Sequence, residues 1–496
     1  MWLLAATAVA AILRLTELGE WSLWVDEAHS WRDATQPLAG FAGSNRVYYP
    51  VTFLLLRGLL HLGVIGQSEW SLRLPFAVIG IATVPLLGVC GRKIVGATPA
   101  VLSAWFLAID PFHVFWSQNA RGYAIVVFTA VIAIERTFAY AREPRTRDMI
   151  AVVLAIAFGA MAHATAGLLA VSLVAFFVLR PMKRIGLRTV FVLVALAAVV
   201  AVVLDKVANN FFSEFLASKD KPSLRHFVQT TGFYFRPVAL LVAAVGLWML
   251  RWIGGRDRAL LLGTFGIVPF LVLLVVGDQV VLVTARYAIC TLPVISWLAA
   301  FACVRAGEAI RGAVGVPLLA RVAACAVLPL LVAGDYGSQL VPYYGAQHGQ
   351  RGRWREAAEL LKERAGKAPI RVLTVNQRTL EYYLRPGHWA NKVPPAYARN
   401  DVMPIEDWMI EKGLDESRVN KVHEPGAAAH IAWHLAQARS KGALFAVVVT
   451  WPELVEKDQD SSLRHELSQS FVLAQYFPCW VGPKDESIHV FLPKEL

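Results

Sequence analysis

The feature that most constrains this chain is a series of long apolar blocks separated by short polar gaps. A helix needs roughly 20 apolar residues to cross a bilayer, and backbone groups that face lipid must be paired within their own segment. The blocks are therefore predicted to be membrane-spanning helices. We expect about eleven spans, near residues 1–18, 71–91, 98–112, 121–140, 148–164, 166–180, 187–205, 237–252, 259–277, 288–305 and 313–334. The first block lacks the basic start and the cleavage site of a signal peptide, which favours an uncleaved span.

The charged residues are few, but they are unevenly distributed. They make up 17% of the 496 residues, against roughly a quarter in soluble domains. The net charge of +12 comes from Arg and Lys in alternate gaps, at 92–93, 136–147, 180–188, 251–258 and 305–311. Basic residues in alternate loops mark the cytoplasmic side. This pattern explains the positive charge by membrane topology, and it excludes a nucleic-acid partner.

The remaining gaps must then face the other side of the membrane. They contain residues 19–70, 113–120, the turn at His163, and residues 206–236 and 277–287. After an odd number of spans, the tail also lies outside. The apolar stretch 50–65 is short for a span and carries Arg57 and His61 on one face, so we expect an interfacial helix there.

Two domains are expected. Residues 1–335 form the transmembrane module, which includes the first outer loop, 19–70, with its interfacial helices. Residues 336–496 are predicted to form an extracytoplasmic α/β domain. Its elements are predicted as helices at 353–361 and 428–440 and strands at 370–375, 444–450 and 488–492. The five cysteines match no metal spacing or disulfide framework.

The first candidate site is the acidic pair Asp26-Glu27, just past the first span and flanked by Trp21, Trp24 and Trp31. One interpretation is a belt of interfacial tryptophans with two solvated acids. The other is a carboxylate in a partly desolvated pocket at the membrane surface. Such a carboxylate would accept a proton from a hydroxyl group.

The second candidate site lies where the third span ends and the fourth begins. Its residues are Asp110, His113, Gln118, Arg121 and Tyr123. An arginine at the outer end of a helix has no role in setting topology, and its fork of donors suits a phosphate. The alternative is an Arg121–Asp110 ion pair that joins two helices.

Further polar residues occupy the outer ends of other spans. Arg286 and Tyr287 open the tenth span, and Arg73 opens the second. For both arginines the alternative is snorkelling to the lipid headgroups. For His163 the alternative is a buried, hydrogen-bonded histidine.

Together these residues offer carboxylate, cation and aromatic surface, which suit an anionic lipid-linked sugar. No phosphate-binding loop, nucleotide fingerprint or zinc spacing occurs in the sequence. The energy for any reaction must then come from an activated substrate. Glu27 and Asp110 are the candidates for holding a divalent cation through oxygen atoms, so the expected cofactor is either none or such a cation.

The sequence resembles the bacterial GT-C glycosyltransferases. These enzymes use polyprenyl-phosphate sugars and include protein O-mannosyltransferases and lipid A aminoarabinose transferases. The resemblance covers nearly the whole chain and is more specific in its first half. It is carried by Asp26-Glu27, PVTFLLLRGLLHL from 50, SEWSLRLPFAVIG at 68–80, SQNARGY at 117–123, ARYAICTLP at 285–293 and WREAAELLKERAG at 354–366.

The resemblance implies that Asp26 is the catalytic base and that Glu27 binds the acceptor or a metal. Members of the family invert the anomeric carbon without a covalent intermediate. The sequence departs from the family at Tyr49, where a cation before a Pro-Pro pair is common, and at Asn119, where a Glu is common. Arg46 is a candidate substitute for the missing cation.

The resemblance also implies the partners. They are a polyprenyl-phosphate sugar donor, a lipid, protein or polysaccharide acceptor, and the bilayer of a bacterial inner membrane. The predicted donor and acceptor site gathers Arg46, Tyr49, Arg73, Asp110, His113, Gln118, Arg121, Tyr123, His163, Arg286 and Tyr287. The alternative function is a transporter or flippase of lipid-linked saccharides. Transporters tend to have repeated halves and polar residues at mid-membrane, and the sequence has no repeat.

Overall fold

The computed structural model describes residues 1–35, 38, 49–180, 224–277, 284–312, 317–374, 376–384, 400–404, 427–451, 454, 462–481 and 484–494. The chain divides into two compact units, each made of separate segments. The helical unit comprises Met1–Leu18, Pro37–Leu55 and Arg73–Pro342, and the tail unit comprises Gly19–Gln36, Leu56–Leu72 and Tyr343–Leu496. This division differs from the expected one at residues 335/336, because two pieces of the first outer loop group with the tail.

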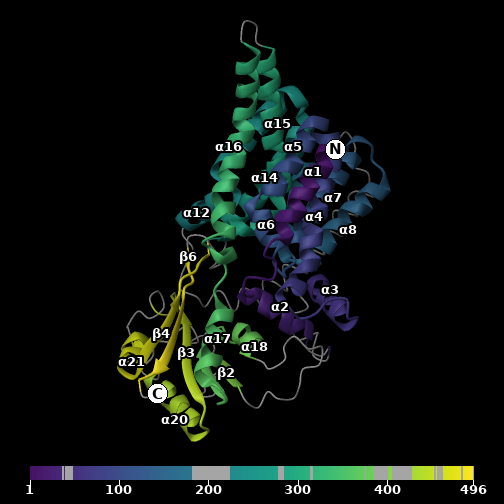
Figure 1. The fold of residues 1–496 in the computed structure, drawn as a ribbon. Helices are drawn as coiled ribbons and strands as arrows, with labels where there is room; N and C mark the ends of the chain where they lie inside the picture. The colour runs from purple at the N-terminus through teal and green to yellow at the C-terminus, as the bar shows by residue number, and fades with distance from the viewer. Residues whose placement is uncertain are drawn as a thin grey trace. The chain divides into compact units, whose positions relative to one another are not determined.

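The helical unit is built from apolar helices (Figure 1). Helix α1 packs on α5, α5 on α15, and α15 on α13, while α7 pairs with α8 and α9 with α14. Helices α3 (Pro50–His61) and α4 (Glu69–Ile94) each contribute residues to both units. The others are α1 (Trp2–Leu15), α5 (Ala97–Ile109), α6 (Pro111–Ser117), α7 (Tyr123–Arg142), α8 (Thr146–Ala162), η3 (Ala164–Ala166), α9 (Gly167–Leu179), α12 (Leu224–Phe235), α13 (Pro237–Met249), η5 (Leu250–Gly254), α14 (Arg256–Gly277), η6 (Ala285–Thr291), α15 (Leu292–Arg311) and α16 (Leu318–Tyr344).

Many of these helices have the length and composition of membrane spans. Among the described residues, five are long and apolar enough: Glu69–Ile94, Tyr123–Arg142, Arg256–Val275, Ala285–Arg311 and Leu318–Tyr344. The count reaches seven if each of two bent pairs is one span, α5 with α6 at 60° and α12 with α13 at 86°. The chain is a polytopic membrane protein, as predicted. The expected span at 187–205 lies outside the described residues.

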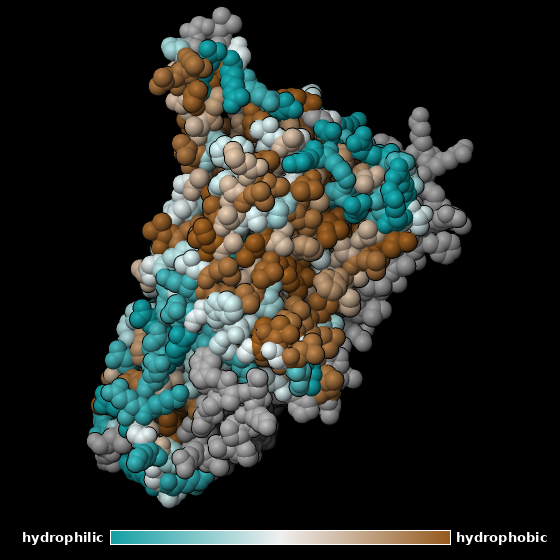
Figure 2. Space-filling view, turned by 45° about the vertical axis from the view of Figure 1, so that its right-hand side comes forward, coloured by the Kyte–Doolittle hydropathy of each residue, from teal (hydrophilic) through white to brown (hydrophobic). Residues whose placement is uncertain are grey.

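The surface of the helical unit agrees with a lipid environment. Apolar side chains cover much of its face in Figure 2. Large apolar residues on several helices are strongly exposed, including Leu154 (63%), Val178 (76%), Leu241 (69%), Val275 (74%) and Leu330 (66%). Such a surface is costly in water and favourable against acyl chains.

Two expected loops contain helices instead. Residues 113–120 were expected to form a turn, but α6 covers Pro111–Ser117. The helix forms because the Asp110 side chain accepts a hydrogen bond from the His113 backbone N–H and a proline occupies the first turn. The expected outer loop 206–236 contains α12, and its residues 206–223 lie outside the described part of the chain.

The tail unit is an α/β structure. Its described strands form a five-stranded sheet in the order β2-β1-β3-β7-β4 and a two-stranded ribbon of β5 with β6. Strands β2, β1 and β3 are parallel, while β7 is antiparallel to β3 and to β4. The elements are α2 (Val25–Thr35), α17 (Trp354–Ala365), β1 (Ile370–Thr374), α18 (Gln377–Leu384), β2 (Asn400–Pro404), α20 (Ala427–Ser440), β3 (Leu444–Thr450), α21 (Ser462–Ser470), β4 (Phe471–Phe477), β5 (Trp480–Val481), β6 (Lys484–Asp485) and β7 (Ile488–Pro493).

Strands β1, β3 and β7 and helices α17 and α20 lie where the sequence predicts them. Every residue of β1 and β3 is buried, as expected of parallel strands covered on both faces. Helices α20 and α21 contribute Ile431, Ala438 and Leu467 to a core on one face of the sheet. Helix α17 packs against β1, β3 and β7 through Ala357, Ala358 and Leu361, among others.

Candidate active site

The structure separates the two members of the acidic pair. Asp26 and Glu27 are the second and third residues of α2. The Glu27 carboxylate accepts a hydrogen bond of 2.9 Å from the backbone N–H of Trp24, which is the reach-back contact of a helix capping box. Glu27 is fully buried, and its Oε2 lies 3.5 Å from Nε of Arg351. Through these contacts Glu27 stabilises the start of the helix that carries Asp26. Asp26 itself is only partly buried.

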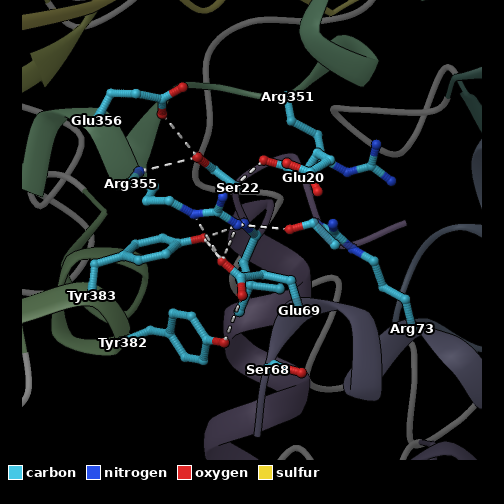
Figure 3. A network of polar contacts seen from close by, with 12 residues as sticks. Glu20, Ser22, Ser68, Glu69, Arg73, Arg351, Arg355, Glu356, Tyr382 and Tyr383 are labelled. Atoms are coloured by element: carbon cyan, nitrogen blue, oxygen red, sulfur yellow. Dashed lines mark hydrogen bonds and ion pairs between the residues drawn. The ribbon is translucent and has the colours of Figure 1, made fainter. Parts of the chain in front are cut away.

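The chain before α2 is held by side chains from the far end of the sequence (Figure 3). The guanidinium group of Arg355 donates to the carbonyl oxygens of Gly19 and Glu20, each at 2.9 Å. The hydroxyl group of Tyr383 accepts a hydrogen bond of 2.7 Å from the backbone N–H of Leu23. The tail unit thus contains both the acidic helix and the groups that hold it.

In the helical unit, a close approach of two helices brings the second candidate site together with His163. Gly122 immediately precedes α7. A Cβ atom there would lie only 2.2 Å from the carbonyl oxygen of Ala162, at the end of α8, and 2.7 Å from the hydroxyl oxygen of Thr52. Only glycine permits this contact, which explains the glycine of the SQNARGY stretch. The next residue, Tyr123, consequently lies against His163.

Aromatic rings meet in tilted contacts at this point. The ring centroids of Trp116 and Tyr123 are 3.8 Å apart, and those of Tyr123 and His163 are 4.0 Å apart. His163 Nδ1 also lies 3.0 Å from the hydroxyl oxygen of Thr165. His163 is thus hydrogen-bonded, as one of the two interpretations of the sequence expected, and it is partly buried in an aromatic cluster.

Two arginines surround this cluster. The Arg121 guanidinium carbon lies 5.2 Å from the ring centroid of Tyr49, and that of Arg286 lies 5.1 Å from the ring of Tyr287. Burial, and then the positive charges of Arg121 and Arg286, hold the pKa of His163 well below its usual range. The imidazole is therefore neutral at pH 7 and lies within the electrostatic influence of two cations. We call Tyr49, Arg121, Tyr123, His163, Arg286 and Tyr287 the cationic cluster.

Three other predicted pocket residues are used within the fold. The Gln118 amide donates to the carbonyl oxygens of Leu13, Arg14 and Thr16 at 3.1, 3.3 and 2.8 Å, which satisfies the open end of α1. His113 Nδ1 lies 2.6 Å from the guanidinium group of Arg14. As described above, Asp110 caps α6. These contacts give the three residues a structural role.

Arg73 is fully buried and donates to the carbonyl oxygen of Leu18 at 3.0 Å. It therefore does not snorkel to a lipid headgroup. Arg46 lies outside the described residues.

Asn119 departs from the pattern of satisfied polar groups. Its side chain is fully buried, and neither its amide nitrogen nor its oxygen has a hydrogen-bond partner among the residues that the structure describes. Buried polar groups are nearly always paired, so this amide is a candidate contact for a polar ligand. As for metals, the described part of the chain contains no group of three or more His, Cys, Asp or Glu side chains placed to hold one.

Sequence reasoning missed several residues of these sites. Trp116, Arg351 and Tyr383 were not among the predicted site residues. Arg14 carried a usable signal, because an arginine inside an apolar span is costly unless it is paired. It is fully buried and donates to the carbonyl oxygens of Leu107 and Ala108, at 3.0 and 2.9 Å.

Comparisons with known proteins agree with this architecture. The family described as dolichyl-phosphate-mannose-protein mannosyltransferase matches residues 49–206. These residues contain Tyr49, the 110–123 stretch and His163. No curated protein sequence matches the chain.

Solved structures extend the similarity to the whole chain. ArnT from Cupriavidus metallidurans, bound to undecaprenyl phosphate, matches over 100% of this chain and 98% of its own, with 14% identity and a TM-score of 0.57. The oligosaccharyltransferase AglB from Archaeoglobus fulgidus, in complex with an inhibitory peptide and a dolichol-phosphate, matches over 98% of this chain and 73% of its own, with 12% identity and a TM-score of 0.55. The family match thus covers part of the first half of the chain, and over nearly its full length the chain shares the fold of the ArnT and AglB structures.

Proposed function

We propose that this protein is an inverting glycosyltransferase that moves a monosaccharide from a polyprenyl-phosphate carrier to a hydroxyl group of an extracytoplasmic acceptor. The acceptor is a lipid, a protein or a polysaccharide. The observation that carries the proposal is the cationic cluster, in which the positive charges of Arg121 and Arg286 both act on a neutral His163. Two guanidinium groups beside closely packed aromatic rings suit a phosphate with an attached sugar.

The relatives support the same ligand class. The ArnT structure holds undecaprenyl phosphate and the AglB structure holds a dolichol-phosphate. Tyr49 stands where a cation was expected, and the Arg121 guanidinium lies over its ring. Arg121 therefore supplies positive charge beside that position, and we assign it the donor phosphate together with Arg286.

Asp26 is the proposed general base. Its neighbour Glu27 is engaged by Arg351 and by the Trp24 amide, which gives Glu27 a role at the start of α2. The resemblance of the acidic pair to that of the GT-C glycosyltransferases assigns proton transfer to Asp26. In the proposed reaction the acceptor oxygen attacks the anomeric carbon, and its proton passes to the Asp26 carboxylate. The bond between that carbon and the phosphate oxygen breaks, and the arginines stabilise the polyprenyl phosphate that leaves.

The proposed setting is the inner membrane of a bacterium, with the tail on the extracytoplasmic side. The alternating basic gaps of the sequence support this orientation. The buried amide of Asn119, two residues before Arg121, is proposed to contact the sugar or its phosphate.

Asp26→Asn tests the assignment, with Asp33→Asn on the same helix as the matched control. The full chain is purified into lipid nanodiscs and supplied with a radiolabelled sugar on a synthetic polyprenyl phosphate. Label is then followed into lipid, protein and polysaccharide fractions. We expect Asp26→Asn to abolish transfer while Asp33→Asn retains it, because only Asp26 is assigned proton transfer.

Full activity of the Asp26→Asn variant would show that Asp26 is not the general base. Movement of the labelled donor across a bilayer without any transfer would instead establish a transporter of lipid-linked saccharides.

A further inference from the structure

The chain that leads into the acidic helix is buried without regular secondary structure. Ser22 and Leu23 are fully buried, and Trp21 is only 3% exposed. The backbone groups of such a segment must be paired, because a buried and unpaired N–H or C=O group costs about 1–3 kcal/mol. The pairing therefore decides where this segment, and the helix after it, is held.

Arg355 and Ser22 anchor the first part of this segment to α17. The Arg355 side chain donates to the carbonyl oxygens of Gly19 and Glu20. The backbone N–H of Arg355 donates to the Ser22 hydroxyl oxygen at 3.0 Å. The same side chain forms a 2.6 Å ion pair with Glu69. These contacts lie within the network drawn in Figure 3.

Tyr383 anchors the last part of the segment. Its hydroxyl group accepts from the Leu23 N–H at 2.7 Å and donates to the Glu69 carboxylate at 3.0 Å. A hydroxyl group that donates to a carboxylate is a stronger acceptor for a second bond. Leu23 is two residues before the first residue of α2, so this bond holds the chain close to the start of the helix.

We infer that Tyr383 is a positioning residue for Asp26, acting through the Leu23 amide and the start of α2. This inference rests on the proposed function, because it takes Asp26 as the base. Proton transfer requires the carboxylate within about 2.6–3.2 Å of the acceptor hydroxyl. Without its acceptor, the Leu23 amide must find another partner, and the helix start moves with it.

The chain offers a matched control in the adjacent tyrosine. Tyr382 is also buried on α18, and its hydroxyl donates to the carbonyl oxygen of Gln67 at 2.6 Å and lies 3.4 Å from Glu69. Tyr382→Phe and Tyr383→Phe each remove one buried hydroxyl group and one contact to Glu69. Only Tyr383→Phe removes the acceptor of the Leu23 amide.

The test measures kcat and donor KM for both variants of the full chain in nanodiscs. A displacement of about 1 Å can cost up to a hundredfold in rate, so we expect Tyr383→Phe to lower kcat about tenfold or more. Its donor KM should change by less than about twofold, and Tyr382→Phe should leave kcat within about twofold. A thermal melt of each variant identifies any loss of folded protein.

A second measurement excludes a merely structural role. In the Asp26→Asn background, Tyr383→Phe should cause no further loss of the residual rate, because there is no base left to position. Should Tyr383→Phe not fold, Arg355→Lys tests the same anchoring, since lysine keeps the charge beside Glu69 but loses the fork that binds two carbonyl groups.

Equal effects of the two tyrosine variants on kcat would overturn the inference, as would an effect of Tyr383→Phe on KM alone. If either result is obtained while the Asp26→Asn variant is inactive, only the positioning role of Tyr383 is rejected. A fully active Asp26→Asn variant removes the proposed function itself.

Discussion

The acidic helix of the tail unit and the cationic cluster of the helical unit are built in different ways. The segment with Asp26 is held by hydrogen bonds and ion pairs from Arg351, Arg355 and Tyr383, more than 300 residues away in the chain. In the cationic cluster, Tyr123 lies in tilted ring contact with Trp116 and with His163, and α7 approaches α8 closely at Gly122.

The difference matches the proposed roles. A base must be placed with an accuracy of a fraction of an ångström, which directional bonds provide. A phosphate site needs charge and shape, and guanidinium groups on aromatic rings provide both without a single fixed geometry. We therefore expect changes in the cluster to act on donor binding and changes around the acidic helix to act on turnover.

The largest effect on donor binding is expected for Arg121→Gln, which removes one of two cations beside the proposed phosphate. A charge-assisted hydrogen bond contributes about 1.5–3 kcal/mol, so the donor KM should rise between about tenfold and a hundredfold. Arg121→Lys keeps the charge and should recover part of the loss. A large fall in kcat at unchanged KM would contradict the proposed division of roles.

A smaller effect is expected for Glu27→Gln. The amide oxygen can still accept from the Trp24 N–H, but the buried contact with Arg351 loses its charge. We expect the free energy of unfolding to fall by about 1–3 kcal/mol, with most of kcat retained. Denaturation and transfer assays on Glu27→Gln and Asp26→Asn measure this contrast. If Glu27→Gln is as inactive as Asp26→Asn, the two acids act together in the reaction.

The smallest effect concerns pH. Since the pKa of His163 in the folded protein lies well below its unfolded value of 6.5, the unfolded chain binds more protons, and stability falls as pH drops below about 6.5. His163 is only partly buried by its neighbours, so we expect a loss of about 1 kcal/mol between pH 7.5 and pH 5. Melting curves of the wild type and of His163→Gln, which cannot titrate there, isolate this contribution. Equal pH dependence in the two proteins would show that His163 does not contribute.

The cationic cluster could largely be predicted from the sequence. Arg121 and Arg286 stand at the outer ends of apolar blocks, where topology gives no reason for a positive charge. Their convergence on His163 could not be predicted, because it depends on how α7, η3 and η6 pack.

The anchoring of the acidic helix was harder to foresee. Arg351 and Tyr383 are two polar residues among many, and their sequence positions contain no sign of a partner near residue 25. The sheet shows the same limit. Strands β1 and β3 are continuous apolar runs and were predicted, whereas β4 is mostly exposed at the edge of the sheet and has no regular alternation.

The discontinuous make-up of the tail unit has a consequence for engineering chimeric enzymes. Residues 19–36 and 56–72 belong to the same compact body as Tyr343–Leu496, so a cut near residue 342 does not isolate a module. Exchanging C-terminal regions between relatives would leave Gly19, Glu20 and Leu23 facing foreign partners. A graft that respects the architecture must carry both loop pieces together with the C-terminal region.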